Sequence, residues 1–374
     1  MPFSARRRTL LRGAVAAIAA PMLNLGSFRV FAGTDRTYST RVVDLVRRSL
    51  VIDMLGPLTL TFTPEKPAAT LSPAEVAMFR ESGINVFHHS VGVGPYAEVM
   101  EFMAAWNGFV GRNSDVFTIV NHIGDLDHAK ATGKIAVIMG QQDADHFRTP
   151  ADVKTFYALG QRVSQLTYNA QNLLGSGSTE RVDGGVTDYG LEIIKAMNAA
   201  GMLVDVSHSG DRTTLDAIEL SSKPIAITHS NCRALNNHPR LKTDEAIKAL
   251  GAKGGVMGIS GVRMFVKATE PTTIEDIVDH IDHVVKLTSI EHVGIGSDSD
   301  LLGYDKMPPE LNKQLRASYK SSYAFRERID IEGFDHPKKV YDLTDALVRR
   351  GYKDADIQLI LGGNFRRLLA GTWV

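Results

Sequence analysis

Three polar residues that end apolar runs could together carry out metal-assisted hydrolysis. The runs are 201–208, 224–229 and 292–298, and they end in His208, His229 and Asp298. Two neutral imidazole nitrogens and a carboxylate oxygen suit zinc and leave a position open for water. A bound divalent ion lowers the pKa of that water to about 7. The alternative from the residues alone is that both histidines are hydrogen-bonded at the rim of the core and that Asp298 caps a loop.

The two histidines need strands that end side by side. Each follows a short run rich in Val and Ile, and residues 211–222 between the runs have the pattern of one helix, which begins at an acidic residue and ends before Pro224. This order predicts strand, helix, strand. In parallel α/β folds the carboxyl ends of the strands face the ligand. We therefore expect His208 and His229 to share one site.

The whole chain repeats this alternation. Eight strands are predicted, at residues 50–55, 84–91, 135–141, 163–169, 203–208, 224–230, 255–260 and 292–298. Amphipathic helices are expected between them, for example at residues 72–82, 191–200, 244–253 and 273–288. Most strands are continuous apolar runs, as expected when both faces are buried. The pattern predicts an α/β fold, a (β/α)8 TIM barrel of the metal-dependent hydrolase type. A doubly wound sheet is the alternative, but no Gly-x-Gly-x-x-Gly follows the first strand.

Two segments depart from plain alternation. Residues 117–121 are expected to form a ninth, accessory strand, and residues 303–336 form a long polar insertion after the eighth strand. The insertion could cover the barrel mouth, form an oligomer contact or be a solvated surface. On the predicted helix 273–288, His280 and His283 are expected to face solvent.

Composition excludes several classes of protein. Lys plus Arg and Asp plus Glu number 42 each, so no overall charge favours nucleic acid or an acidic membrane. The single cysteine, Cys232, excludes an intrachain disulfide and a Cys-rich zinc site.

The first residues have the pattern of an export signal. Residues 6–12 are basic (Arg-Arg-Arg-Thr-Leu-Leu-Arg), residues 13–25 are a short apolar run, and Val30-Phe31-Ala32 resembles a cleavage site. We therefore expect residues 1–33 to be a signal of the twin-arginine type, residues 34–374 to be one barrel domain, and the location to be periplasmic. A Sec signal or an uncleaved anchor is the alternative.

Several motifs, in this order, resemble the membrane (renal) dipeptidase family of the amidohydrolase superfamily. They are Asp205-Val-Ser-His208, Ile227-Thr-His-Ser230, His238-Pro-Arg240 followed by Asp244, the run 292–298, and Gly362-Gly-Asn-x-x-Arg367. The resemblance covers residues from about 50 to the C-terminus. It implies a (β/α)8 barrel that typically holds two zinc ions and hydrolyses dipeptides.

The sequence departs from that family at its metal ligands. The family's first strand ends in Asp-x-His-x-Asp, but here Leu55 and Pro57 occupy the two ligand positions. Gln142 replaces the metal-bridging glutamate, and Tyr168 replaces a histidine that holds the reacting centre. Leucine and proline cannot bind zinc, so we expect one ion rather than two. Replacement ligands could come from His88, Asp143, Asp145 and His146.

The resemblance to the family implies roles for the site residues that this sequence keeps or replaces. His208, His229 and Gln142 are the candidate metal ligands, and Asp298 accompanies the catalytic water. Tyr168 would donate a hydrogen bond to an oxyanion, and Arg240 would bind a substrate carboxylate through its planar guanidinium.

We therefore expect a hydrolase of a dipeptide-like, carboxylate-bearing small molecule with one zinc ion. The alternative is a catalytically silent or non-hydrolytic barrel that binds acidic small ligands. No nucleic-acid partner or transmembrane segment is expected, and a homodimer stays open.

Overall fold

The structure is a computed structural model of the chain, and it describes residues 27–28, 37–61, 67, 70–90 and 93–373. The predicted export signal lies outside the described residues, apart from the backbone of Ser27–Phe28. These two residues form β1, which pairs antiparallel with β2 (Tyr38–Ser39). In the described part of the chain, no helix is long and apolar enough to cross a membrane.

Eight parallel strands close into a barrel, as the sequence predicts. They are β3 (Ile52–Asp53), β4 (Val86–His89), β6 (Ile135–Gln141), β7 (Gln161–Gln165), β8 (Leu203–Asp205), β9 (Ala226–Ser230), β10 (Val256–Ile259) and β11 (Val293–Ile295). Each pairs with the next, β11 pairs with β3, and β4 pairs with β6, which completes the ring. The expected accessory strand is β5 (Phe117–Ile119), which pairs with the first half of β6.

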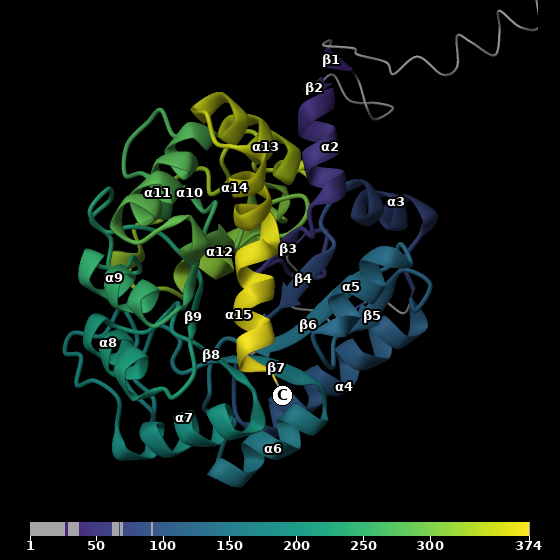
Figure 1. Cartoon of the computed structure of the whole chain (residues 1–374). Helices are drawn as coiled ribbons and strands as arrows, with labels where there is room; N and C mark the ends of the chain where they lie inside the picture. The colour runs from purple at the N-terminus through teal and green to yellow at the C-terminus, as the bar shows by residue number, and fades with distance from the viewer. Residues whose placement is uncertain (1–26, 29–36, 62–66, 68–69, 91–92, 374) are drawn as a thin grey trace, which may run out of the picture.

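Helices surround this barrel (Figure 1). They are α2 (Thr40–Arg48), α3 (Pro73–Glu81), α4 (Tyr96–Arg112), α5 (Gly124–Ala131), α6 (Pro150–Ala158), α7 (Asp188–Ala200), α8 (Asp211–Leu220), α9 (Asp244–Ala252), α10 (Arg263–Val266), α11 (Ile274–Leu287), α13 (Lys339–Arg350) and α14 (Asp354–Gln358). Short 3₁₀ and π turns, η1 (Ile290–His292) and η4 (Leu359–Gly363), connect the last units.

Local sequence explains where these helices begin and end. Ser72 and Glu75 form a capping box at the start of α3, with Pro73 in the first turn. At the end of α7, Gly201 has a φ of 79°, a left-handed conformation that glycine adopts without strain. These signals predict the helix bounds to within a few residues.

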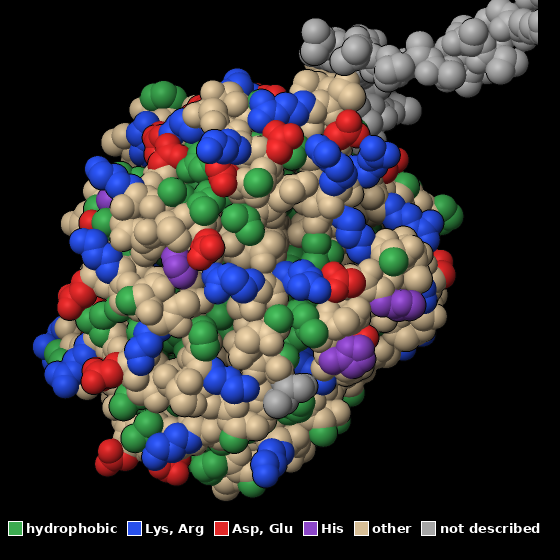
Figure 2. Space-filling model, viewed as in Figure 1, with side chains coloured by type: hydrophobic (Ala, Val, Ile, Leu, Met, Phe, Trp, Pro, Cys, Tyr) green, Lys and Arg blue, Asp and Glu red, His purple; other side chains and the backbone are tan. Residues whose placement is uncertain are grey.

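One end of the barrel is closed by the last helix, α15 (Asn364–Thr372). Phe365, Leu368 and Leu369 pack against apolar residues that begin the strands, such as Ala136 and Val163. Figure 1 shows α15 lying across the end of the barrel that faces the viewer. On this face acidic and basic side chains are interspersed (Figure 2), in keeping with the equal numbers of the two charges. Because this end is packed shut, a ligand can enter only from the carboxyl ends of the strands.

The insertion at residues 303–336 covers that other end. It contains η2 (Tyr304–Lys306), α12 (Pro309–Ala317) and η3 (Ser321–Tyr323). Tyr323 and Ile329 pack with Val262, Met264 and Phe265 of the barrel loops in a small separate core. Lys320 Nζ also donates to Thr179 O and to Glu180 Oε1, each at 3.0 Å. Of the three possibilities that the sequence leaves open, the structure shows a cover over the barrel mouth.

Candidate active site

His208 and His229 meet above the ends of β8 and β9. Their Nε2 atoms lie 3.0 Å apart, and both side chains are buried. Gly258 of β10 and Gly296, which follows β11, both lie against Thr228 O of β9, so closely that a Cβ on either glycine would overlap it. The glycines let β9 approach its neighbours and so set the position of His229.

Neighbouring side chains determine which nitrogen of each ring carries the proton. His208 Nδ1 lies 2.9 Å from Asn169 Oδ1, which can only accept. His229 Nδ1 lies 2.8 Å from Thr228 Oγ1, and that hydroxyl donates its own hydrogen to Asp205 Oδ2 at 2.6 Å. With the Asn169 amide in this orientation both Nδ1 atoms donate, so both Nε2 atoms present lone pairs to each other.

Two facing lone pairs at this distance repel each other, and a cation bound to both nitrogens would remove that repulsion. A proton is disfavoured, because burial, and then the positive charge of Arg240, lower the pKa of both histidines well below the ordinary value. Two neutral imidazole nitrogens directed at one point are what a transition metal ion such as zinc binds. No three His, Cys, Asp or Glu side chains of the described residues are grouped so that they could hold a metal ion. The donor set thus offers two imidazole nitrogens to one ion, and the number of ions per chain stays a prediction.

Asp298 lies at the edge of the same site. Its backbone N–H donates to Leu55 O at 2.9 Å, and its φ of 55° is a left-handed conformation that aspartate tolerates better than most residues. Burial raises the pKa of its carboxyl to about 7, Arg240 opposes this rise, and Asp53 and Asp300 add to it. The side chain borders the cavity below and stays partly accessible. A carboxyl with a pKa near neutrality is suited to take up and release a proton.

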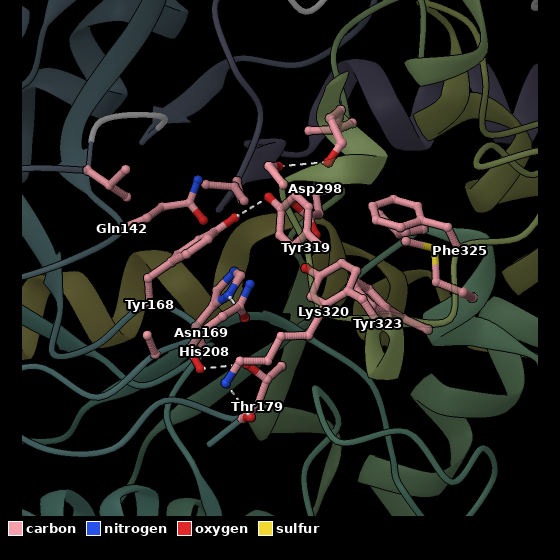
Figure 3. A pocket seen from close by; sticks show the side chains of 18 of the residues that line it. Gln142, Tyr168, Asn169, Thr179, His208, Asp298, Tyr319, Lys320, Tyr323 and Phe325 are labelled. Carbon is pink, nitrogen blue, oxygen red and sulfur yellow. Dashed lines mark hydrogen bonds between the residues drawn. The ribbon is translucent and has the colours of Figure 1, made fainter. Parts of the chain in front are cut away.

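A cavity of about 640 Å³ lies between the barrel mouth and the insertion (Figure 3). His208, Asp298, Gln142 and Tyr168 line its barrel side. Residues of the insertion line the other side, namely Tyr304, Leu315, Ser318, Tyr319, Lys320, Tyr323, Phe325 and Ile329. The volume is in the range of small-molecule sites, which is about 300–1,000 Å³.

Tyr168 connects the two sides of the cavity. Its ring stacks on His208 with centroids 4.1 Å apart, and its hydroxyl lies 2.8 Å from that of Tyr319 (Figure 3). Burial and then the charges and phenols around it raise its pKa well above the ordinary value. The phenol therefore stays neutral and keeps its hydrogen for donation.

Arg240 lies behind the cavity wall. Its side chain is 1% exposed, and it is absent from the residues that line the cavity. Nη1 donates to Ser207 O and Nη2 to His229 O, while Nε has no hydrogen-bond partner among the described residues. The guanidinium thus supports the backbone beside both histidines, and contact with a substrate carboxylate stays a prediction.

A family model for the membrane dipeptidases (Peptidase family M19) matches residues 85–318, more than half of the chain. The chain belongs to the membrane dipeptidase family.

Relatives and solved structures agree with this assignment. The chain is 30% identical to dipeptidase verJ of Clonostachys rogersoniana over 263 residues, which are 70% of this chain and 61% of that protein. It is 35% identical to an uncharacterized dipeptidase of Schizosaccharomyces pombe over 175 residues, 45% of this chain and 42% of the relative. The chain therefore spans less than two thirds of the length of these curated relatives.

An amidohydrolase from Pseudomonas aeruginosa has a similar solved structure. It is 29% identical, with a TM-score of 0.78 over 89% of this chain and 99% of that one. A metallopeptidase from Rhodobacter sphaeroides, with a bound phosphinate mimic of the dipeptide L-Ala-D-Ala, has a TM-score of 0.68 at 17% identity over 86% of this chain and 99% of that one. The second likeness shows the fold alone. The predicted membrane dipeptidase resemblance and the predicted TIM barrel are both confirmed.

The departures from the membrane dipeptidase pattern lie in the cavity wall. Leu55 and Pro57 line the cavity where the family places a histidine and an aspartate. Gln142 also lines it, and its amide Nε2 donates to Ser90 O at 2.5 Å. This bond holds the amide in place, and metal binding by Gln142 stays a prediction.

The suggested replacement ligands have other environments. His88 Nδ1 lies 2.6 Å from Met54 O, and His146 Nε2 lies 3.1 Å from Gln161 Oε1 among Phe147 and Phe156. Asp143 borders the cavity and accepts from Asn172 Nδ2 at 2.7 Å, whereas Asp145 is exposed. None of them forms a three-ligand group with His208 and His229 among the described residues.

One predicted orientation is wrong. His280 of α11 was expected to face solvent, but it is 1% exposed. Its Nε2 lies 2.9 Å from Val266 O, and its Nδ1 accepts from Cys232 N at 3.1 Å. These backbone partners satisfy both ring nitrogens and allow the histidine to be buried.

Three residues of the site, Asn169, Thr228 and Tyr319, are not among those predicted from the sequence. Asn169 and Thr228 adjoin predicted site residues, so the need of a ligating histidine for a second partner could have indicated them. No local pattern indicates Tyr319, because its partner Tyr168 is 151 positions away.

Proposed function

We propose that this chain hydrolyses the amide bond of a small, dipeptide-like molecule that bears a carboxylate, with one zinc ion held by His208 and His229. The facing Nε2 atoms of the two histidines carry this proposal. They lie 3.0 Å apart, and the Nδ1 atom of each ring is already engaged in a hydrogen bond, so the two Nε2 atoms favour a shared cation. A decayed site would have no reason to keep both orienting partners, Asn169 and Thr228.

The bound ion would polarise the scissile carbonyl and make a water more acidic. Asp298 borders the same cavity as His208, so its carboxyl is suited to accept a proton from the attacking water and to return it to the departing amine. Tyr168, neutral and adjacent to His208, can donate a hydrogen bond to the oxygen on which negative charge develops. The insertion covers the reacting groups and limits their contact with bulk water.

The test combines elemental analysis with a dipeptide hydrolysis assay on the purified chain. We expect about one zinc per chain, hydrolysis that chelators abolish, and loss of both the ion and at least 100-fold of the rate in His208→Ala and His229→Ala, since each substitution removes a ligand. His128→Ala is the matched control, because His128 is exposed on α5.

Each contrary result has a defined meaning. Two ions per chain would refute the single-ion assignment. Hydrolysis that survives chelators would indicate acid–base chemistry by Asp298 without a metal. A chain with neither ion nor hydrolysis would be a silent, ligand-binding barrel, and the proposal would be rejected.

A further inference from the structure

Three rings of the insertion, Tyr319, Tyr323 and Phe325, form a continuous aromatic wall with Phe265 of α10. The Phe265 and Tyr323 centroids lie 5.4 Å apart, those of Tyr323 and Tyr319 4.4 Å, and those of Tyr319 and Phe325 5.5 Å. All four residues border the cavity, and Figure 3 shows Tyr319, Tyr323 and Phe325 there. Ring pairs at such separations favour edge and face contacts with a further ring.

The opposite side of the cavity has a different chemistry. His208 and Asp298 provide the reacting groups, and Leu55 adds apolar surface next to them. A ligand that fills the space must therefore have a polar, reacting end at the barrel and an apolar group against the insertion. The cavity, at about 640 Å³, offers room for a side chain much larger than a methyl group.

The wall is held in a defined place relative to the reacting groups. Tyr319 bonds to Tyr168, which stacks on His208. The next residue, Lys320, donates to Thr179 O and pairs with Glu180 Oε1. Arg316 lies over the Phe325 ring, with its Cζ 5.3 Å from the centroid. A wall fixed at several points can select a side chain by shape.

We propose that this aromatic wall is a specificity subsite, which selects dipeptide-like substrates with an aromatic side chain in one of their two residues. The inference rests on the proposed function for the identity of the reacting end. It narrows the proposed substrates from dipeptide-like molecules in general to those with an aromatic side chain.

Binding of analogues that cannot be hydrolysed tests the subsite separately from catalysis. The probes are reduced-amide dipeptides, with CH2–NH in place of the amide, that carry either two Ala side chains or one Phe and one Ala in each order. Calorimetry should show that one Phe analogue binds about ten- to a hundredfold more tightly than the Ala analogue, as burial of one ring implies. Parallel rate measurements on Ala-Ala, Ala-Phe and Phe-Ala dipeptides should show the same preference in kcat/KM.

Variants at Phe325 locate the preference. Phe325→Ala should reduce the Phe-over-Ala ratio at least fivefold, and Phe325→Leu, which keeps apolar bulk without a ring, should reduce it less. Leu173→Ala is the control, because Leu173 is 73% exposed and outside the cavity lining. Thermal melting of each variant identifies any loss of folding.

The outcomes separate the two proposals. Preferred binding of a Phe analogue without dipeptide hydrolysis would support the subsite and reject the hydrolase. Hydrolysis with no preference between Ala and Phe would reject the subsite and keep the hydrolase. Failure of all analogues to bind, or a preference unchanged in a folded Phe325→Ala, would also overturn the inference.

Discussion

At the scale of single residues, the site depends on groups that orient the two imidazoles. Asn169 and Thr228 accept from the Nδ1 atoms, and Asp205 in turn accepts from Thr228. Hydrogen bonds of this kind orient ligating histidines and set their tautomer. The motif residues alone therefore do not define the site.

Replacing Asn169 tests this orientation. In Asn169→Leu, His208 Nδ1 has no acceptor, so the ring can turn or change tautomer. We expect zinc affinity to fall about 10- to 100-fold, measured by competition with a chromophoric chelator. Asn107→Leu, at a part-buried position of α4, is the control. Unchanged affinity in Asn169→Leu would show that the bond does not orient a ligand.

Asp298 should control the pH dependence of both activity and stability. The folded protein keeps the Asp298 proton up to a pKa of about 7, whereas the unfolded chain loses it near pH 4. The contribution of the Asp298 carboxyl to the free energy of unfolding of the wild type therefore falls as the pH rises between these two values. In chelator-treated protein, Asp298→Asn should raise the Tm relative to wild type, by an amount that grows from pH 4 to 7 and then levels off. The same variant should abolish hydrolysis at every pH at which the wild type is active, because it removes the group that accepts the proton of the attacking water. A pH-independent difference in Tm would contradict this assignment.

The two bonded tyrosines should differ in their effect on turnover. Tyr168→Phe removes the phenol next to His208 and should lower kcat about 10²–10³-fold, the usual cost of one oxyanion donor. Tyr319→Phe leaves Tyr168 its hydrogen, so we expect less than a tenfold loss. Steady-state kinetics would measure kcat for both variants, with Tyr157→Phe as the control. Equal losses of kcat in Tyr168→Phe and Tyr319→Phe would assign the donor role to the pair of tyrosines.

At the scale of elements, close strand contacts place the reacting groups. β9 lies close to β10 and to the residue that follows β11 because glycine occupies positions 258 and 296. Any added side chain would displace Thr228, which orients His229.

Gly258→Ala should therefore weaken both the fold and metal binding. Overpacking of this kind typically costs about 1–3 kcal/mol, which a denaturant titration would measure. Gly111→Ala is the matched control, because Gly111 lies inside α4 and a Cβ there would meet no atom of the described residues within 4 Å, apart from its own helix backbone and chain neighbours. That change should be neutral or stabilising. Equal stability of the two variants would show that β9 can move without cost.

Apolar runs predict the strands of this fold well, since strands buried on both faces leave a clear signal. Residues 135–141 are both the predicted and the observed bounds of β6. Other strands end before their site residues. β8 stops at Asp205, and His208 lies in the loop that follows. The left-handed φ of Asp298 and the contact between Tyr168 and Tyr319 depend on tertiary packing, which local patterns do not record.

At the scale of the whole molecule, the remaining proposal is export to the periplasm by the twin-arginine route. Residues 6–12 carry the paired arginines, and the route transports proteins that are already folded. Replacing Arg7 and Arg8 by lysine should leave the chain in the cytoplasm, as measured by cell fractionation and immunoblotting. Export of the double variant would favour the Sec route.

The residues for catalysis and those for substrate selection come from different parts of the chain. The reacting groups come from strand ends and loops scattered from residue 142 to residue 298, whereas most of the wall facing them comes from one continuous stretch, residues 304–329. Selectivity in this lineage could therefore change through exchange of a single gene segment, while the catalytic framework is inherited intact. For enzyme engineering, grafting such stretches between relatives offers a direct way to diversify substrates on one barrel.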